Sequence, residues 1–122
     1  MTDALATVDV HQHFLPESLV RLLRRRSRPP RIEGSDLILC DGGFPFDPSG
    51  HEIEARVATL DRYGIDVAIV SLQPTLGLAA LERSEREELV GTWEDGVSEL
   101  VRGSDGRCLA LAGGPRGVPP LL

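Results

Sequence analysis

The chain has 122 residues, of which 41% are hydrophobic and 26% charged, an ordinary balance for one globular domain. All 13 basic residues are arginines and the formal net charge is −6, which argues against a general affinity for nucleic acid or acidic membranes. The sequence has neither a signal-peptide pattern at its start nor a hydrophobic run approaching the roughly 18 residues of a membrane span. Cys40 and Cys108 lack metal-site or disulfide spacing and are expected to be reduced, buried thiols. Together these features predict a soluble cytoplasmic protein.

The first predicted element is a strand over residues 7–14 that carries two histidines. Because side chains alternate between the faces of a strand, four polar residues are expected on one face: Thr7, Asp9, His11 and His13. Histidines at positions i and i+2 lie roughly 6.5 to 7 Å apart, and both can bind one metal ion through bonds of about 2.0–2.1 Å. Ordinary surface histidines show the same spacing, so the pattern alone leaves both interpretations open.

A helix is predicted to begin at Pro16 and to end by Ser27, because Arg28-Pro29-Pro30 cannot continue it. Its buried side would consist of Leu19, Leu22 and Leu23. The arginines between positions 24 and 31 form a local basic cluster. We interpret the cluster as a solvated helix end, where cations offset the helix dipole. A phosphate-binding patch is the weaker alternative, because no aromatic residues alternate with the arginines.

A small hairpin excursion is predicted at about residues 31–46, and a second helix follows it and ends at Gly64. Gly34-Ser35 is a plausible hairpin turn, and Asp41-Gly42-Gly43 turns the chain again. Ser49 and Glu52 fit a capping box, and Gly64 is placed to end the helix in the left-handed conformation. The third histidine, His51, is expected on the surface at the start of this helix.

The rest of the chain predicts two further strands and a third helix. Residues 67–72 form the hydrophobic run typical of a parallel strand covered on both faces. A helix is expected from Ser84, with Trp93 packed in the core, followed by a strand at 108–112 and a tail from Gly113 without further elements. The order βαβαβ predicts an α/β fold with three parallel strands. Polar residues that could line a site follow the second of these strands: Ser71, Gln73 and Thr75.

Two segments resemble a known superfamily. Val8-Asp9-Val10-His11-Gln12-His13-Phe14-Leu15-Pro16 resembles the first-strand signature of the amidohydrolase superfamily, in particular the amidohydrolase-related family that includes aminocarboxymuconate-semialdehyde decarboxylases. Arg62-Tyr63-Gly64-Ile65-Asp66-Val67-Ala68 is similar to that family's passage into its second strand. The resemblance implies a partial TIM (β/α)8 barrel, with residues 1–122 as the amino-terminal portion carrying the first three βα units.

The resemblance also implies a chemistry. His11 and His13 would bind a divalent metal, zinc in the first place and manganese or cobalt as alternatives. Asp9 would orient a ligand imidazole without binding the metal itself, and a purely structural role for Asp9 is the equal alternative. The ion would activate water for hydrolysis of C–N or C–O bonds in a small-molecule substrate. The alternative within the family is non-oxidative decarboxylation of a small, often aromatic, acid. No arginine occurs from Ile32 through Ala55 to bind a substrate carboxylate, as in some decarboxylases of this family.

A complete barrel takes about 250 residues and would need further metal ligands, but no histidine follows His51. We therefore expect the isolated chain to be inactive and to require the rest of the barrel, either from the same polypeptide or from a complementing chain. The alternative is a non-catalytic interaction module that forms a homo-oligomer through the open edge of its sheet.

Overall fold

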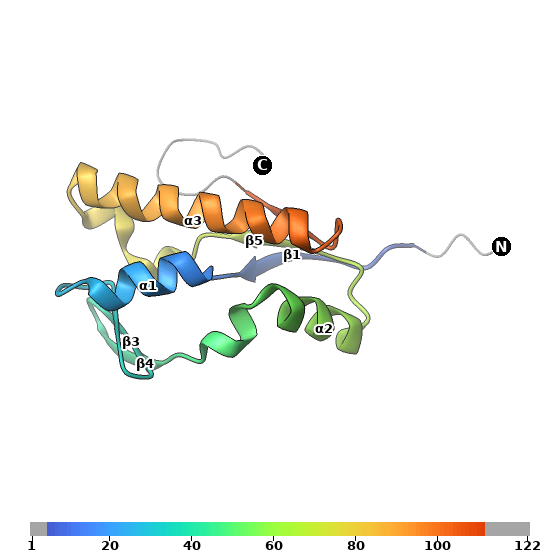
Figure 1. The fold of residues 1–122 in the computed structure, drawn as a ribbon, viewed down its shortest axis with the longest axis horizontal. Coiled ribbons are helices and arrows are strands. Elements are labelled where there is room, and N and C mark those ends of the chain that lie inside the picture. Colours follow the sequence, from blue (N-terminus) through green and yellow to red (C-terminus); the bar gives the residue numbers. More distant parts are fainter. Residues whose placement is uncertain (1–4, 112–122) are drawn as a thin grey trace.

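A parallel three-stranded sheet with helical crossovers forms the frame of the computed structural model, which describes residues 5–111 (Figure 1). The strand order is β1-β5-β6, and all neighbours are parallel. The strands are β1 (Val8–His13), β5 (Val67–Ser71) and β6 (Cys108–Ala110). The predicted α/β class and its three parallel strands are thereby confirmed. The described residues form no closed barrel.

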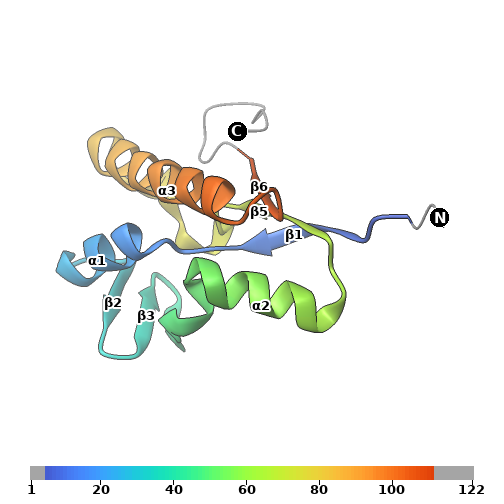
Figure 2. The same ribbon diagram turned by 45° about the vertical axis from the view of Figure 1, so that its right-hand side comes forward.

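Two helices connect the three parallel strands. α2 (Ile53–Tyr63) precedes β5, and α3 (Arg83–Gly103) precedes β6 (Figures 1 and 2). Both crossovers advance in the same direction along the sheet, so right-handed connections place α2 and α3 over the same face. Alternate residues of the strands are fully buried on that face: Ala68, Val70, Cys108 and Ala110. On β1, Val8 and Val10 are 46% and 70% exposed. One face of the sheet is therefore covered by helices, and we call the other the open face.

The first helix and the hairpin follow the sequence prediction closely. α1 (Glu17–Arg25) buries Leu19, Leu22 and Leu23. The second sheet is antiparallel and consists of β2 (Arg31–Glu33), β3 (Asp36–Leu39) and β4 (Gly42–Pro45). The hairpin turn at Gly34 has a positive φ of 59°, which glycine adopts without strain. Gly42 and Gly43, expected in a turn, instead form the beginning of β4.

The start of α2 differs from the prediction. A short 3₁₀ helix, η1 (Pro48–His51), precedes α2, and Asp47 caps it by accepting a hydrogen bond from the Ser49 amide at 2.9 Å. Glu52 stands at the N-cap of α2 without a side-chain hydrogen bond, so the capping box predicted for Ser49 and Glu52 does not form. The carboxyl end of α2 agrees with the prediction, since Gly64 adopts φ 67° and ends the helix.

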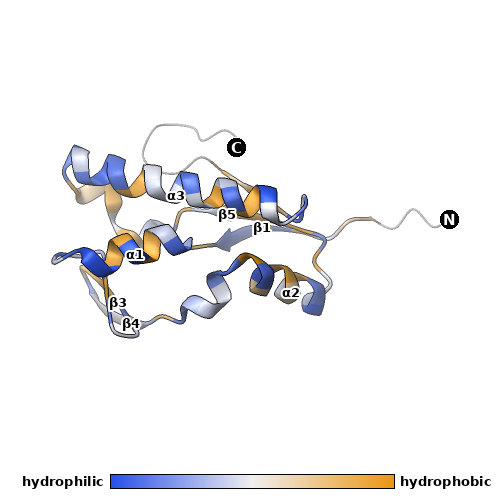
Figure 3. Cartoon of the chain, in the orientation of Figure 1, coloured by the Kyte–Doolittle hydropathy of each residue, from blue (hydrophilic) through white to orange (hydrophobic). Residues whose placement is uncertain are grey.

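The third helix contributes five buried hydrophobic residues to the core: Leu89, Val90, Trp93, Val97 and Leu100. α3 begins at Arg83, one residue before the predicted start, and no side chain caps its N-terminus. Hydrophobic residues recur along α1 and α3 between hydrophilic ones (Figure 3). Trp93 is fully buried and donates from Nε1 to the main-chain oxygen of Phe14 at 2.8 Å, which confirms its predicted packing role. Two 3₁₀ turns precede α3, η2 (Pro74–Leu76) and η3 (Leu78–Ala80).

The two cysteines differ in their exposure to solvent. Cys108 is buried as expected, but Cys40 is exposed because it lies in the turn between β3 and β4.

The predicted third strand is β6, which ends at Ala110, while the remainder of the expected strand at residue 112 and the tail from Gly113 lie outside the described residues. Within residues 5–111, none of the helices has the length and hydrophobicity of a membrane span.

Candidate functional site

A β-bulge shapes β1 where the histidines lie. Val8 pairs with Val67 and Asp9 with Ala68, but the next matched pair is Gln12 with Val70. Val10 and His11 therefore stand opposite Ile69 alone, which defines a bulge in β1. Paired residues of neighbouring strands share a face, and Ala68 and Val70 are buried beneath the helices.

The bulge changes which residues share a face. Asp9 and Gln12 fall on the helix-covered face, whereas His13, paired with Ser71, falls on the open face. Strict alternation would place Asp9 beside His11 and His13, so the expectation of one common polar face is wrong for Asp9. The reason is the extra residue, which reverses the alternation after Asp9.

The two predicted ligand residues do lie together. The ring centroids of His11 and His13 are 4.8 Å apart and the rings are inclined at 78°. Two imidazoles that bind one tetrahedral ion through bonds of about 2.0–2.1 Å place their centroids about 5 Å apart. His13 Nδ1 lies 3.1 Å from the main-chain oxygen of Ser71 at the carboxyl end of β5. When Nδ1 donates to that oxygen, the neutral ring presents Nε2 as its free lone pair, as in many metal sites.

Asp9 acts on the histidine pair through the backbone. One carboxylate oxygen accepts from the His11 amide at 3.1 Å, and the other accepts from Gln12 Nε2 at 3.0 Å. These hydrogen bonds stabilise the charged form and lower the pKa of Asp9 below its ordinary value, the Gln12 bond being the stronger cause. The structure thus places Asp9 against the main chain of His11, and these two contacts do not involve an imidazole.

Arg56, on α2, meets the carboxyl end of β1. Its Nη1 donates to Gln12 Oε1 at 3.2 Å and to the main-chain oxygen of His13 at 2.9 Å. Burial lowers the pKa of the Arg56 guanidinium from its ordinary value. Arg56 is not among the predicted site residues, although its position in the sequence carries a signal. Arg56 is three residues after Ile53 and four before Leu60, so the helical period places this charged residue on the same side of α2 as two hydrophobic residues.

His51 is not the surface residue that the sequence predicted. It is half-buried, its Nδ1 accepts from the Leu15 amide at 2.9 Å, and its ring lies 5.1 Å from the Phe46 ring. Burial lowers the pKa of His51 to about 4, and the positive charge of Arg56 adds to the effect. The prediction failed because η1 folds back against the segment that leaves β1.

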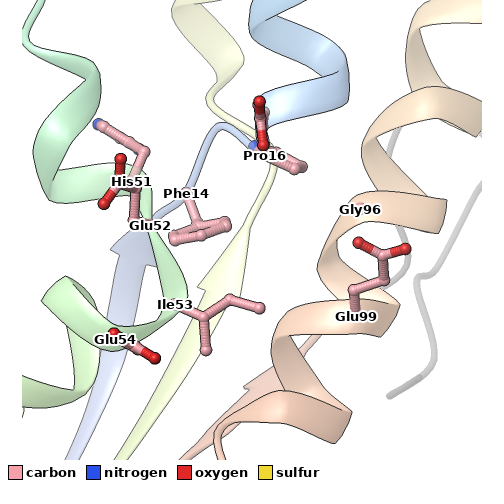
Figure 4. Close-up of a pocket in the computed structure, with 9 residues that line it drawn as sticks. Phe14, Pro16, His51, Glu52, Ile53, Glu54, Gly96 and Glu99 are labelled. Atoms are coloured by element: carbon pink, nitrogen blue, oxygen red, sulfur yellow. The ribbon is translucent and has the colours of Figure 1, made fainter.

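A cavity of about 270 Å³ lies next to His51 on the helix-covered side. Figure 4 shows Phe14 between the residues of η1 and α2 and those of α3. The lining also includes Pro16, Ile53, Gly96 and four glutamates, Glu17, Glu52, Glu54 and Glu99. This cavity lies at the segment that leaves β1 and is not lined by His11 or His13.

The arginine cluster binds groups within the protein. Arg26 donates to the main-chain oxygen of Pro30 at 2.8 Å, and Arg28 forms a 2.7 Å ion pair with Glu85. Arg31 pairs with Glu33 at 2.8 Å. These partners favour the structural interpretation over a phosphate-binding patch.

The described residues provide only part of a metal site. Among residues 5–111, no three His, Cys, Asp or Glu side chains are grouped so that they could hold one ion. His11 and His13 fit two positions of a coordination sphere, whereas catalytic zinc usually has three protein ligands. The sequence matches no protein-family model and no curated protein.

Proposed function

We propose that this chain is the amino-terminal part of a metal-dependent, amidohydrolase-like hydrolase. The observation that carries the proposal is the contact of the His11 and His13 rings, 4.8 Å apart at the carboxyl end of a parallel strand. In barrels of parallel strands, catalytic groups gather at that end. The resemblance of residues 8–16 to the amidohydrolase first strand gives the same assignment.

In this proposal His11 and His13 supply two ligands of a divalent ion, preferably zinc. The bound ion would act as a Lewis acid and lower the pKa of a water molecule that attacks the substrate. His13 would bind through Nε2, because its Nδ1 lies within hydrogen-bonding distance of the Ser71 carbonyl. Asp9 fixes the His11 main chain. The remaining ligands and the acid/base group would come from chain outside the described residues.

The open face supports a larger barrel. Parallel strands are normally covered on both faces, yet Val8 and Val10 on β1 are 46% and 70% exposed. Further strands that close a barrel would cover these side chains and enclose His11 and His13. We therefore propose a partial TIM barrel whose open face becomes the interior of the complete domain.

Hydrolysis is favoured over decarboxylation. Some carboxy-lyases of the resembled family bind the substrate carboxylate through an arginine in the segment after the first strand, and residues 32–55 contain no arginine. The next arginine, Arg56, already donates to Gly50, Gln12 and His13. Its guanidinium is thus engaged within the protein.

Titration with zinc tests the proposal. The purified chain should bind Zn²⁺, and His11→Ala or His13→Ala should lower the affinity by at least about tenfold, because even the loss of a group that only orients a ligand costs about 10- to 100-fold. His51→Gln is the matched control, because it removes the third histidine and should leave zinc affinity unchanged. Manganese and cobalt would be titrated in the same way. The proposal is refuted if the folded wild-type chain binds no more zinc than a variant that carries both His11→Ala and His13→Ala.

The exposed valines favour one second candidate, a non-catalytic interaction module. This function predicts an oligomer whose assembly depends on the open face and not on metal. Sedimentation of the wild-type chain and of Val10→Asp, with and without a chelator, distinguishes the two proposals. An oligomer that survives chelation and dissociates in Val10→Asp, without zinc uptake, would favour the module.

A further inference from the structure

We infer that Arg56 is a positioning residue for the histidine pair and acts on it through Gln12 and Asp9. Its relevance to chemistry rests on the proposed function, but the arrangement itself is a property of the free chain. The hydrogen-bonded side chains lead from α2, on the helix-covered face of the sheet, to the bulge in β1 that contains His11.

The guanidinium of Arg56 is fixed before it reaches β1. Nε and Nη2 donate to the main-chain oxygen of Gly50 at 3.3 and 3.1 Å. The group also lies 5.1 Å from the centroid of the Phe14 ring, within the range of a cation–π contact. η1 and the segment after β1 thereby hold Arg56 from two sides, and its Nη1 is left to face β1.

The chemistry of the neighbours then dictates the orientation of Gln12. Arginine has only hydrogen-bond donors and a carboxylate only acceptors. Gln12 lies between Arg56 and Asp9, so its oxygen faces Arg56 at 3.2 Å and its NH₂ group faces Asp9 at 3.0 Å. The reverse orientation would set donor against donor and acceptor against acceptor.

Asp9 completes the path at the bulge. Its other carboxylate oxygen accepts the His11 amide at 3.1 Å, in the segment where Val10 and His11 face Ile69 alone. A bulge interrupts the ladder of main-chain hydrogen bonds, and the carboxylate supplies an acceptor there. Arg56 also donates directly to the main-chain oxygen of His13. The backbone at both histidines is therefore held by one connected set of side chains.

We expect this set to keep the two imidazoles preorganised for one ion. Gln12→Ala cuts the connection between Arg56 and Asp9 while leaving Arg56 bound to Gly50 and His13. Arg56→Lys keeps the charge and loses the planar group that donates in several directions. Arg62→Gln is the matched control, because Arg62 is an exposed arginine on the same helix.

Two measurements on the full chain test the inference. The first is the NMR cross-relaxation between the His11 and His13 ring protons without metal, and the second is titration with Zn²⁺ alone. Gln12→Ala and Arg56→Lys should weaken the ring contact and lower zinc affinity by about 10- to 100-fold, the effect of losing groups that orient metal ligands. Arg62→Gln should change neither quantity.

The outcomes separate this inference from the proposed function. If Gln12→Ala is folded by circular dichroism and retains both the ring contact and wild-type zinc affinity, the inference is overturned. If Gln12→Ala loses the ring contact but no form of the chain binds zinc, the positioning role stands and the metal proposal fails. Should Arg56→Lys fail to fold, Gln12→Ala alone decides.

Discussion

Lowering the pH should destabilise the protein through His51. This ring is half-buried against Phe14 and Phe46, and burial lowers its pKa from the ordinary 6.5 to about 4. Because Nδ1 accepts the Leu15 amide, the neutral ring carries its proton on Nε2. A second proton must go to Nδ1, so protonation also breaks the hydrogen bond to Leu15. Of the charged neighbours, Arg56 opposes protonation and Asp47 favours it weakly.

The sign and size follow from proton linkage. Between pH 6.5 and 4 the unfolded chain binds the proton at His51 more readily than the folded chain does, so stability rises with pH in that window. The contribution is fully present above pH 6.5, falls as the pH drops to about 4, and then levels off. At about 1.4 kcal/mol per pKa unit the full shift corresponds to about 3 kcal/mol. His51 is partly exposed and solvent screens its charge, so we expect about 1–2 kcal/mol.

Urea unfolding at pH 7.5 and pH 4.5 measures this loss, and His51→Gln serves as the reference. Glutamine cannot become charged, so the variant retains the pH dependence that comes from the carboxylates. The free energy of unfolding of the wild type should fall by about 1–2 kcal/mol more than that of the variant. Equal losses in the two proteins, or an NMR titration of the ring near pH 6.5, would refute this reasoning.

Two further predictions concern the packing around two glycines of α3 and the burial of the two cysteines. In Gly96→Ala the new Cβ would lie 2.2 Å from Pro16 Cβ, so overpacking of about 1–3 kcal/mol should exceed the helix-propensity gain and lower the free energy of unfolding in urea. Gly91→Ala, in the same helix with open space around it, should raise that free energy by up to about 1 kcal/mol, and equal effects at the two glycines would contradict the structure. Cys40 should react with a thiol reagent in the native protein, whereas Cys108 should react only on unfolding, because it is buried and burial raises its pKa. Rapid reaction of both thiols in the native protein would contradict this assignment.

The secondary structure could be predicted wherever the periodicity of hydrophobic residues reports burial directly. α1 and α3 bury leucines, valines and Trp93 that share one helical face, and β5 begins with the four consecutive hydrophobic residues at 67–70. Gly64 ends α2 because a positive φ at a helix end is a local requirement that glycine meets best. These features depend on near neighbours in the sequence, so the sequence alone indicates them.

The features that were not predicted depend on distant contacts. The bulge in β1 is visible only in its register with β5, and it places Asp9 on the opposite face from His13. His51 is half-buried because η1 packs against Phe14, 37 residues earlier in the chain. Arg56 is partly buried, although charged residues usually face water. Main-chain oxygens and the Gln12 side chain accept its hydrogen bonds there in place of water. The spacing of His11 and His13 indicated the candidate site, but not the residues that hold it.

The polarity of β1 is the reverse of that of an ordinary half-buried strand. Val8 and Val10 face solvent, whereas Gln12 lies on the helix-covered face with Arg56 as a partner. Polar groups tolerate that position only when they are paired, and within residues 5–111 every buried side-chain nitrogen or oxygen has a hydrogen-bond partner. Covering the open face would remove the Val8 and Val10 side chains from water, which stabilises a protein by about 25 cal/mol per Å² of buried apolar surface. The same cover would exclude bulk water from an ion bound to His11 and His13. Electrostatic interactions of the ion would then be stronger, because the dielectric constant of bulk water weakens them. The reversed polarity is therefore expected of a strand whose open face lies inside a larger barrel, the condition that the proposed metal chemistry requires.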